Sequence, residues 1–214
     1  MVKEGYWFGL PLLLIACGLM SFGYSGSAEG LTAGGIFFLA LALLVMNFFR
    51  DPERIAPADP YAIASPADGK VVEISEELIG SKRFQRVSIF MSPFDVHVNR
   101  SPIAGTIGEV SYRKGKFRVA YDPRASVENE QNIFWVRGKQ GEVMVRQIAG
   151  VVARRIAFWK RPGDYIMRGE RVGLIRFGSR VDVLMDMSVR VAVRKGHRVR
   201  AGSSILGYSA NQDD

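Results

Sequence analysis

The chain is poor in residues that bind metals or form crosslinks: its 214 residues include one cysteine, Cys17, and two histidines, His97 and His197. A single cysteine excludes a disulfide framework within the chain and any zinc finger built on cysteine ligands. Two histidines are too few for a His-rich centre, so we expect no metal. Charge is missing from 5–28 and 30–49, which contain no Asp, Glu, Lys or Arg. With 48% hydrophobic and 23% charged residues overall, a wholly disordered chain is excluded.

The two uncharged stretches are long enough to cross a membrane. About 20 apolar residues span a bilayer as a helix, and both 6–24 and 31–49 meet that requirement. The sequence GSAEG at 26–30 is a short connection, so the pattern predicts a helical hairpin. A cleaved signal peptide is the alternative for the first stretch. It is disfavoured because Lys3 is balanced by Glu4 and a second apolar stretch follows at once.

All of the excess positive charge lies outside this hairpin. Residues 1–50 contain two basic and two acidic groups, so the net charge of +8 belongs to 51–214. The loop between the apolar stretches has no Lys or Arg, whereas Lys3, Arg50 and Arg54 flank their outer ends. Cationic flanks stay cytoplasmic, so we expect a membrane anchor, 1–50, and a domain, 51–214, on the cytoplasmic side of the inner membrane. An anionic leaflet attracts such a domain, and without a recognised binding motif we expect no nucleic acid as a partner.

The second part of the chain has the pattern of a β protein. Pro52, Pro57 and Pro60 stop any helix that continues from the second apolar stretch. Long helical periodicity is absent from 61–214, where apolar residues form short β-branched or alternating runs bounded by Gly, Pro or Asn. The clearest runs are 71–74, 86–91, 106–112, 133–136, 142–148 and 180–185.

Two short patterns recur in this part. GDYIMRGERV (163–172) has the same spacing of glycine and β-branched residues as GHRVRAGSSI (196–205), with glycines where a positive φ is expected. An Ala–Gly element followed by apolar residues occurs at 66–71, 103–107 and 148–152. Such hairpins resemble those of biotinyl and lipoyl domains. We therefore expect a mainly β fold, a compact β-sandwich or barrel-like domain with biotinyl/lipoyl-like hairpins, after an N-terminal transmembrane helical hairpin.

Few side chains in the β part suit acid–base or nucleophilic chemistry. Asp68 lies in SPADGKV, His97 in FMSPFDVHVNRSPIAG and Ser179 in RVGLIRFGSRVDV. A Ser/His/Asp set supports nucleophilic catalysis. Each residue also has a structural interpretation, as a turn aspartate, a core histidine and a common Gly-Ser pair. The second histidine, His197, lies in a turn of the repeat and is interpreted as structural or exposed.

The order of five motifs is more informative than any single residue. FFRDPER (48–54), SPADGKV (65–71), FMSPFDVHVNRSPIAG (90–105), YDPRASVENEQN (121–132) and GERVGLIRFGSRVDV (169–183) follow one another along the chain. In this order they resemble the phosphatidylserine decarboxylase family, in its short bacterial and archaeal form, over nearly the whole chain. The most specific pieces are the Asp-x-His-x-Asn, Glu-Asn-Glu-x-Asn and Phe-Gly-Ser-Arg-Val-Asp blocks.

The resemblance implies a proenzyme that cuts itself at a Gly-Ser bond, here between Gly178 and Ser179. The products would be a β chain, 1–178, and an α chain, 179–214, that begins with a pyruvoyl group derived from Ser179. That group would form a Schiff base with phosphatidylserine in an anionic membrane and release CO2 to give phosphatidylethanolamine, with no metal and no pyridoxal phosphate. Gly-Ser at 202–203 looks like the cleavage site of longer members, but it lacks the apolar lead-in that precedes Ser179.

Two further residues are assigned to this chemistry through the resemblance. His97 is the candidate base for the Ser179 hydroxyl, because an imidazole with an ordinary pKa of about 6.5 suits neutral pH. Asp68 is the candidate that orients His97 and stabilises its cation. Longer family members carry His-x-x-His in this block, and in them the second histidine is the one linked to the catalytic triad. This chain has Arg100 at that position. His97 is the one histidine left in this block, so we expect it to serve both self-cleavage and decarboxylation.

The resemblance also suggests where the lipid binds. The candidate substrate-binding residues are Asn129, Glu130 and Asn132 in ENEQN, with Arg113 and Lys114 to meet lipid phosphate. A polar or solvated loop is the structural alternative for both groups. The implied partners are the α and β chains of one proenzyme, and related enzymes suggest a homodimer.

Three other functions fit parts of the sequence. Archaetidylserine has the same reacting head group as phosphatidylserine and is the alternative substrate. A non-enzymatic, membrane-tethered adaptor of the biotinyl/lipoyl type would need a lysine between methionines at a hairpin tip, whereas 185–187 reads Met-Asp-Met. A serine hydrolase using Ser179, His97 and Asp68 would show Gly-x-Ser-x-Gly, which is absent around Ser179.

Overall fold

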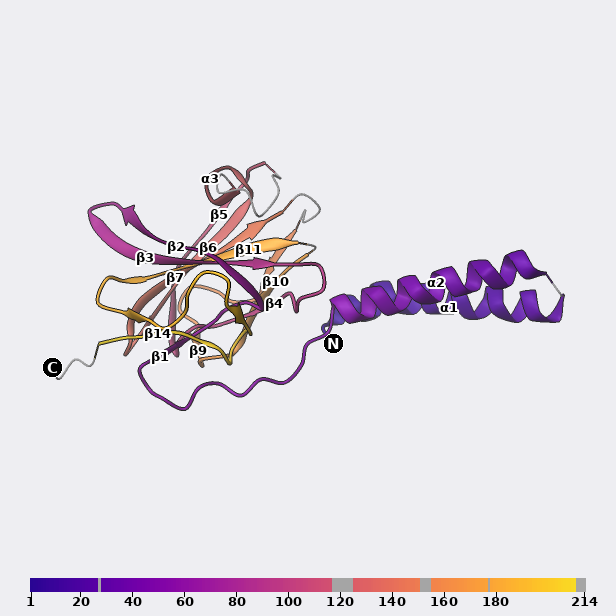
Figure 1. The fold of residues 1–214 in the computed structure, drawn as a ribbon, viewed down its shortest axis with the longest axis horizontal. Coiled ribbons are helices and arrows are strands. Elements are labelled where there is room, and N and C mark those ends of the chain that lie inside the picture. The colour runs from indigo at the N-terminus through magenta and orange to yellow at the C-terminus, as the bar shows by residue number, and fades with distance from the viewer. Residues whose placement is uncertain (27, 117–124, 151–154, 177, 211–214) are drawn as a thin grey trace. The chain divides into compact units, whose positions relative to one another are not determined.

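The computed structural model (Figure 1) describes residues 1–26, 28–116, 125–150, 155–176 and 178–210. The chain divides into two compact units, a hairpin unit of Met1–Pro52 and a β unit of Glu53–Asp214. Part of the motif at 121–132 and part of the third Ala–Gly element at 148–152 lie outside the described residues.

The hairpin unit consists of the helices α1 (Lys3–Ser25) and α2 (Glu29–Phe48). Both are long and apolar enough to cross a membrane, which confirms the apolar helices expected from the sequence. They pack through small residues: Gly5, Gly9, Ala16 and Gly23 are buried on α1, and Gly35 and Ala42 on α2. A Cβ at Gly35 would lie 3.0 Å from the carbonyl oxygen of Ala16, so glycine lets the two backbones approach closely.

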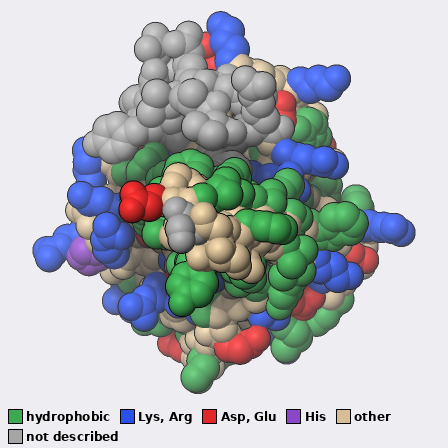
Figure 2. Space-filling model, turned by 90° about the vertical axis from the view of Figure 1, so that its right-hand side faces the viewer, with side chains coloured by type: hydrophobic (Ala, Val, Ile, Leu, Met, Phe, Trp, Pro, Cys, Tyr) green, Lys and Arg blue, Asp and Glu red, His purple; other side chains and the backbone are tan. Residues whose placement is uncertain are grey.

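Large apolar side chains of the hairpin point away from the helix–helix interface. Trp7 and Phe22 on α1 and Phe37 on α2 are 79%, 74% and 63% exposed. Figure 2 looks onto the loop end of the hairpin and shows mostly apolar side chains there. Small residues inside and large apolar residues outside suit a lipid environment, because hydrocarbon does not disfavour exposed apolar surface as water does.

Within the described residues, the β unit is built on an antiparallel sheet of eight strands in the order β13-β2-β3-β11-β7-β6-β5-β9. The strands are β2 (Gly69–Ile79), β3 (Lys82–Met91), β5 (Gly105–Arg113), β6 (Gln131–Gly138), β7 (Gly141–Ala149), β9 (Tyr165–Ile166), β11 (Ser179–Asp186) and β13 (Arg198–Val199). The sheet curls into a half-barrel (Figure 1). This architecture confirms the mainly β fold, and each predicted run lies within one of the six longest strands of this sheet.

Two smaller sheets and a short helix complete the described part of the β unit. One sheet has the order β1-β14-β12, with β1 at Ala62–Ala64, β14 at Ile205–Tyr208 and β12 at Arg190–Val191. The other has the order β4-β10-β8, with β4 at Val98–Arg100, β10 at Arg171–Ile175 and β8 at Ile156–Phe158. The helix α3 covers Ala125–Glu128.

The inner face of the large sheet carries the apolar core. Side chains alternate along a strand, and on the central strand β11 the side chains of Val181, Val183 and Met185 are fully buried in this core. Val87 on β3 and Val145 on β7 lie opposite Val183 and join them. Burial of a side chain of this size contributes about 1.5–3 kcal/mol, so the core holds β11 firmly between its neighbours.

The outer face of β11 carries charged side chains that are nevertheless buried. Arg180 is 1% exposed and pairs with Asp182 at 2.7 Å and with Glu73 at 2.9 Å. Burial alone would lower the pKa of Arg180, but Asp182 and Glu73 outweigh it and raise that pKa. Burial likewise favours the neutral form of Glu73, yet Arg180 and Arg86 lower its pKa. Ion pairs thus fix β11 on the face opposite the apolar core.

Two segments of the β unit share the same local pattern. The segment β1–turn–β2 matches β4–turn–β5, with Ser65-Pro66 in the first turn and Ser101-Pro102 in the second. Each serine hydroxyl donates to the carbonyl oxygen two residues further on, at 2.7 Å in both turns. The local geometry is therefore the same, but the first turn carries Asp68 where the second carries Ala104.

The repeated glycine patterns contact these two segments in equivalent ways. The strands β9 and β13 begin two residues after Gly163 and Gly196, and they pair with β5 and β2 respectively. The later glycines of the patterns, Gly169 and Gly202, donate their N–H groups to the backbone oxygens of the two turn serines at 2.8 and 2.7 Å. All four have φ between +74° and +97°, which confirms the positive φ expected at these positions.

Candidate active site

Ser179 is the first residue of β11, at the head of the central strand. It lies opposite Met91 of β3 and Ala149 of β7 and is fully buried. Its hydroxyl lies 3.3 Å from the Sδ atom of Met91. Gly178 before it has φ = +56°, a left-handed conformation that favours glycine over any residue with a side chain. The bond between Gly178 and Ser179 therefore joins a left-handed glycine to the first residue of the central strand.

His97 is fully buried directly before β4. Its Nδ1 lies 2.9 Å from the carbonyl oxygen of Asp95, and because a carbonyl oxygen only accepts, Nδ1 carries a proton. In the neutral ring Nε2 has the lone pair and is the basic atom. The Asp95 carboxylate accepts hydrogen bonds from the backbone and hydroxyl of Ser92. The backbone oxygen of His97 accepts one from Ile175, four residues before Ser179, at 3.4 Å.

Asp68 lies in the turn before β2 and is 9% exposed. Its Oδ2 accepts a hydrogen bond from Arg54 Nη2 at 2.8 Å, and its Oδ1 accepts one from the backbone N–H of Ala201 at 2.7 Å. Gly69 allows the turn to approach β3, because a Cβ there would overlap the carbonyl oxygen of Phe90. The carboxylate is thus held from both sides, on a turn that is packed against β3.

The segments that carry these three residues meet at one end of the large sheet. Ser179 on β11 pairs with Met91 at the end of β3, and Asp68 directly precedes β2 on the other side of β3. Adjacent strands are about 4.8 Å apart, so β2 and β11 are separated by about 10 Å. His97 follows the end of β3 by six residues. The fold therefore brings together segments that are far apart in the sequence.

Asn129 and Glu130 hold Ala149, the residue of β7 that lies opposite Ser179. Asn129 is fully buried and donates from Nδ2 to the carbonyl oxygen of Ala149 at 2.7 Å. The backbone oxygen of Glu130 accepts the Ala149 N–H at 3.0 Å, and its carboxylate accepts the hydroxyl of Tyr112. Burial and the hydrogen bond to Glu130 raise the pKa of Tyr112 to about 12.

The other predicted binding residues differ in their exposure. Asn132 on β6 is 3% exposed, and its Nδ2 donates to Oε1 of Gln147 on β7 at 2.8 Å. Arg113 and Lys114 are exposed at the end of β5, where Arg113 pairs with Gln131. A ligand in solvent can reach these two cations, whereas Asn132 is buried.

Three residues to which the sequence analysis gave no role in the site also belong to this region. Arg54 is the ion-pair partner of Asp68. Gln147 donates from Nε2 to Oδ1 of Asn99 at 2.8 Å, and both side chains are fully buried. The sequence signal for this contact is a glutamine among the inward positions of β7, where Val143, Val145 and Ala149 are apolar.

A pocket opens beside Asp68 and is also lined by Asp95, Arg198, Arg200, Ser203 and Ser204. The guanidinium of Arg198 lies 3.6 Å from the carboxylate of Asp95. The backbone oxygen of Asp95 accepts the Nδ1 hydrogen bond of His97. The pocket is therefore lined by Asp68 itself and by a residue that contacts His97.

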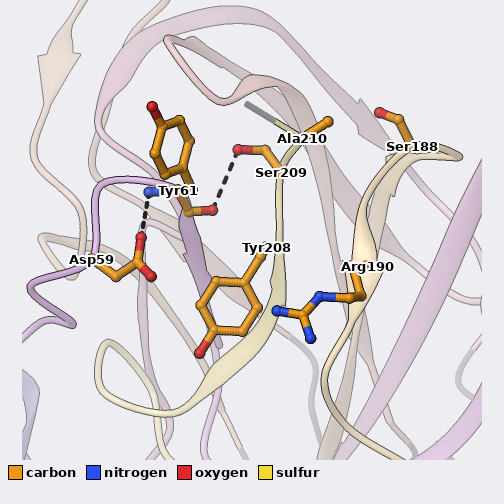
Figure 3. Close-up of a pocket in the computed structure, with 7 residues that line it drawn as sticks. All are labelled: Asp59, Tyr61, Ser188, Arg190, Tyr208, Ser209 and Ala210. Carbon is orange, nitrogen blue, oxygen red and sulfur yellow. Dashed lines mark hydrogen bonds between the residues drawn. The ribbon is translucent and has the colours of Figure 1, made fainter. Parts of the chain in front are cut away.

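A second pocket, shown in Figure 3, is lined by Asp59, Tyr61, Ser188, Arg190, Tyr208, Ser209 and Ala210. The guanidinium of Arg190 lies 5.0 Å from the ring centre of Tyr208. This pocket contains none of the candidate residues. Within the described part of the chain, no group of three His, Cys, Asp or Glu side chains is placed to hold a metal ion.

Comparison with known proteins gives the relatives of this chain. Residues 41–207 match the family model described as phosphatidylserine decarboxylase. The phosphatidylserine decarboxylase proenzyme of Solibacter usitatus is 53% identical over 177 residues, which cover 81% of this chain and 84% of that protein. The proenzymes of the same name from Geobacter metallireducens and Salinibacter ruber are 45% and 47% identical, over 95% and 86% of this chain and 94% and 81% of theirs.

These matches define the chain as a carboxy-lyase, an enzyme that removes a carboxyl group as CO2. It belongs to the phosphatidylserine decarboxylase family, which confirms the resemblance of the five motifs. The serine hydrolase and the non-enzymatic adaptor are thereby set aside.

Proposed function

We propose that the chain is a proenzyme that cleaves itself between Gly178 and Ser179 and then converts phosphatidylserine to phosphatidylethanolamine and CO2. The proenzyme names of its relatives support self-processing. The observation that carries the site is a glycine with φ = +56° directly before a buried serine at the head of the central strand. Pairing with β3 on one side and β7 on the other fixes Ser179 relative to the preceding peptide group.

Self-cleavage begins when the Ser179 hydroxyl attacks the carbonyl carbon of Gly178. The C–N bond breaks, an ester forms between that carbonyl and Ser179 Oγ, and the amine of Ser179 is freed. Loss of the Cα proton of residue 179 then breaks the Cβ–Oγ bond and releases the β chain, 1–178, with a carboxylate. Water hydrolyses the remaining unsaturated amine, ammonia leaves, and the α chain, 179–214, begins with a pyruvoyl group.

His97 is the proposed base for the first step. Its Nε2 is the basic atom because Nδ1 donates to the carbonyl oxygen of Asp95. In this role Nε2 takes the proton of the Ser179 hydroxyl and returns it to the departing amine. Asp68 is proposed to orient His97 and to stabilise its protonated form through the negative charge of its carboxylate, because the Nδ1 proton of His97 is already donated to the Asp95 backbone. Arg54 fixes the Asp68 carboxylate.

Arg100, at the position of the second histidine of longer family members, has a structural contact in this chain. It is 5% exposed and donates from Nη1 to the carbonyl oxygen of Gly169 at 2.9 Å. We therefore propose that His97 serves both self-cleavage and protonation during decarboxylation.

The surroundings of residue 179 suit a pyruvoyl group. This group supplies an electron sink for the electron pair left when CO2 departs, without a metal or pyridoxal phosphate. Met91 and Ala149 on the two neighbouring strands are apolar and fully buried. A carboxylate in such surroundings lacks the hydration that stabilises it in water, which favours its loss as neutral CO2.

Polar and cationic side chains around the site are proposed to bind the lipid head group. Asn129, Glu130 and Asn132 form its polar wall on β6 and the segment before it. Arg113 and Lys114 are proposed to meet lipid phosphate, because exposed cations attract anionic head groups. We propose phosphatidylserine rather than archaetidylserine as the substrate because the relatives are named for phosphatidylserine.

The hairpin is proposed to anchor the enzyme in the inner membrane, with the catalytic domain on the cytoplasmic side. In this proposal 1–50 is the anchor and 51–214 is the catalytic domain. The apolar helices and the cations that flank them support it. The α and β chains would stay associated because β11 remains paired with β3 and β7. We also propose a homodimer and no nucleic-acid partner.

Intact-mass analysis of the purified protein tests the proposed cleavage. We expect fragments of 178 and 36 residues, with the shorter one blocked by pyruvoyl at its N-terminus. Ser179→Ala should remain one chain without activity, whereas Ser203→Ala should still be cut. A single uncut chain with an intact Ser179, in protein that turns over phosphatidylserine, would contradict the proposal.

A further inference from the structure

Buried amide side chains form a continuous relay beside Ser179. Asn132 Nδ2 donates to Gln147 Oε1 at 2.8 Å, and Gln147 Nε2 donates to Asn99 Oδ1 at 2.8 Å. Asn99 Nδ2 then donates to the carbonyl oxygen of Pro66 at 3.4 Å. The three amide side chains are between 0% and 3% exposed. This amide relay of Asn132, Gln147 and Asn99 therefore lies inside the β unit.

The last acceptor fixes the direction of every hydrogen bond in the amide relay. The carbonyl oxygen of Pro66 can only accept, so Asn99 presents its NH2 group to Pro66 and its oxygen to Gln147. Gln147 in turn presents its NH2 group to Asn99 and its oxygen to Asn132. Each amide donates to one neighbour and accepts from the other. An apolar replacement of Gln147 therefore leaves a buried group unsatisfied on both sides.

The amide relay connects the segments that carry the proposed base and its orienting acid. Asn99 lies two residues after His97, and Pro66 lies two residues before Asp68. Gln147 holds Asn99 from the other side, through the large sheet. A displacement of Gln147 would therefore be passed to both segments.

Gln147 and Asn99 also lie close to Ser179. Gln147 pairs with Val181, which makes it the diagonal neighbour of Ser179 on the same face, at about 7–8 Å between Cα atoms. Asn99 Nδ2 lies 3.8 Å from the sulfur of Met91, which the Ser179 hydroxyl also contacts. The amide relay thus shares a neighbour with the proposed nucleophile.

Gln147 reaches Asn99 across a gap left by Gly173 of β10. Gly173 pairs with Asn99. A Cβ at Gly173 would lie 3.1 Å from Gln147 Nε2 and would overlap the carbonyl oxygen of Ala157. The glycine therefore leaves room for one amide to bridge the large sheet and the β4-β10-β8 sheet, next to which His97 lies.

We propose that Gln147 is a positioning residue for self-cleavage, which holds the segments of His97 and Asp68 in register with Ser179 through the amide relay. This inference rests on the proposed cleavage between Gly178 and Ser179. Gln147 acts through Asn99 and not on the reacting atoms. A misplacement of about 1 Å between reacting groups can reduce a rate by about a hundredfold, so the effect on cleavage should be large.

The time course of self-cleavage tests this role. The full chain is synthesised in a cell-free system with vesicles of phosphatidylcholine and phosphatidylglycerol and followed by denaturing gel electrophoresis and intact mass. Gln147→Leu should slow cleavage by about a hundredfold. The matched control is Gln131→Leu on β6: Gln131 is 1% exposed, lies on the opposite face and donates to the carbonyl oxygen of Ser126 at 2.8 Å. The control should lose stability yet cleave at the wild-type rate.

A pH series with Gln147→Glu separates positioning from general destabilisation. A protonated carboxyl group can donate to Asn99 and accept from Asn132, as the amide does, whereas the ionised carboxylate can only accept. The rate of this variant divided by the wild-type rate should therefore rise as the pH falls through the pKa of the new carboxyl group. The division removes the titration of His97, which both proteins share. This pH series also tests the positioning role of Gln147 if the Gln147→Leu variant does not fold.

Two results would overturn the positioning role. One is wild-type cleavage by folded Gln147→Leu, or equal slowing by Gln131→Leu. The other is a rate ratio for Gln147→Glu that does not change with pH. Failure of the proposed function is distinguishable, because the wild-type chain would then remain uncut, or Ser179→Ala would be cut, in the same assay.

Discussion

Ser179 and Met91 face each other across β11 and β3, and the Ser179 hydroxyl lies 3.3 Å from the Met91 sulfur although the two residues are 88 positions apart in the sequence. A thioether is a weak hydrogen-bond acceptor. The proposed nucleophile therefore has a well-packed neighbour that competes little for its proton, which leaves the hydroxyl available to a base.

Replacement of Met91 tests this relationship. Met91→Leu keeps nearly the same volume, and such exchanges cost less than about 1.5 kcal/mol of stability. We expect self-cleavage to go to completion in this variant. Met91→Gln places a strong acceptor beside the hydroxyl and should slow cleavage. Denaturing gels over time measure both rates. Loss of cleavage in Met91→Leu with an unchanged melting temperature would show that the sulfur itself is required.

The conformation of Gly178 gives a second prediction. A residue with a Cβ in the left-handed region costs about 1–2 kcal/mol, so Gly178→Ala should lower the melting temperature and slow self-cleavage. Gly80, in the turn between β2 and β3, has nearly the same φ, +61° against +56°. A Cβ at either position meets no atom of the described residues within 4 Å. Gly80→Ala should therefore cost similar stability without affecting cleavage. Equal cleavage rates in the two variants would contradict a role for the Gly178 backbone.

Asp186, at the far end of β11, gives a third prediction, which concerns the loss of folding stability in acid. The hydrogen bond from Lys82 and that from the backbone of Ser188 lower the pKa of Asp186 from 3.8 to about 2. The folded chain binds this proton less readily than the unfolded chain. The stabilisation is therefore fully present above about pH 4 and is lost as the pH falls toward 2.

Asp186→Asn should remove that contribution. Because the side chain of Asp186 is 39% exposed, solvent screening limits the effect to about 1 kcal/mol or less. Urea unfolding of both proteins in detergent measures the difference in the free energy of unfolding, which should be largest near neutral pH and shrink between pH 4 and pH 2. A difference that is the same at both ends of this range would refute the assignment.

The ion pairs on the outer face of β11 give a fourth prediction. Arg180→Met leaves the fully buried Asp182 without its 2.7 Å partner and should cost about 3–5 kcal/mol. Lys82→Met breaks an equally short but exposed pair with Asp186 and should cost no more than about 1 kcal/mol. Chemical denaturation in a Ser179→Ala background avoids interference from cleavage. Similar small losses in both variants would mean that burial does not control the strength of these pairs.

Much of the fold could be predicted from local patterns in the sequence. The helices of the hairpin follow from two uncharged stretches, and each of the six predicted runs lies inside a strand. The positive φ of Gly169 and Gly202 was also expected. Alternation, hydropathy and glycine turns are properties of a few consecutive residues, so they can be recognised without knowledge of the fold. The family followed from motif order in the same way.

The contacts of the candidate site could not be predicted in this way. Gln147 follows Arg146 in a strand of mixed polarity, so nothing local indicates its partner, Asn99, which lies 48 positions away. The ion pair of Arg54 with Asp68 and the deep burial of Arg180 were equally hidden. Such partners depend on the register between strands, and a shift of one residue would turn every side chain to the other face.

The sequence by itself therefore determined the apolar hairpin, the β-rich body, the family and the candidate residues Asp68, His97 and Ser179. Only the tertiary structure decided what surrounds them: a turn held by Arg54, a buried imidazole hydrogen-bonded to the Asp95 backbone, and a serine between two strands. The physical reason is that the local pattern of apolar and polar residues decides which side chains of a strand face the core. The register between neighbouring strands, which decides which side chains meet, depends on the packing of the whole core.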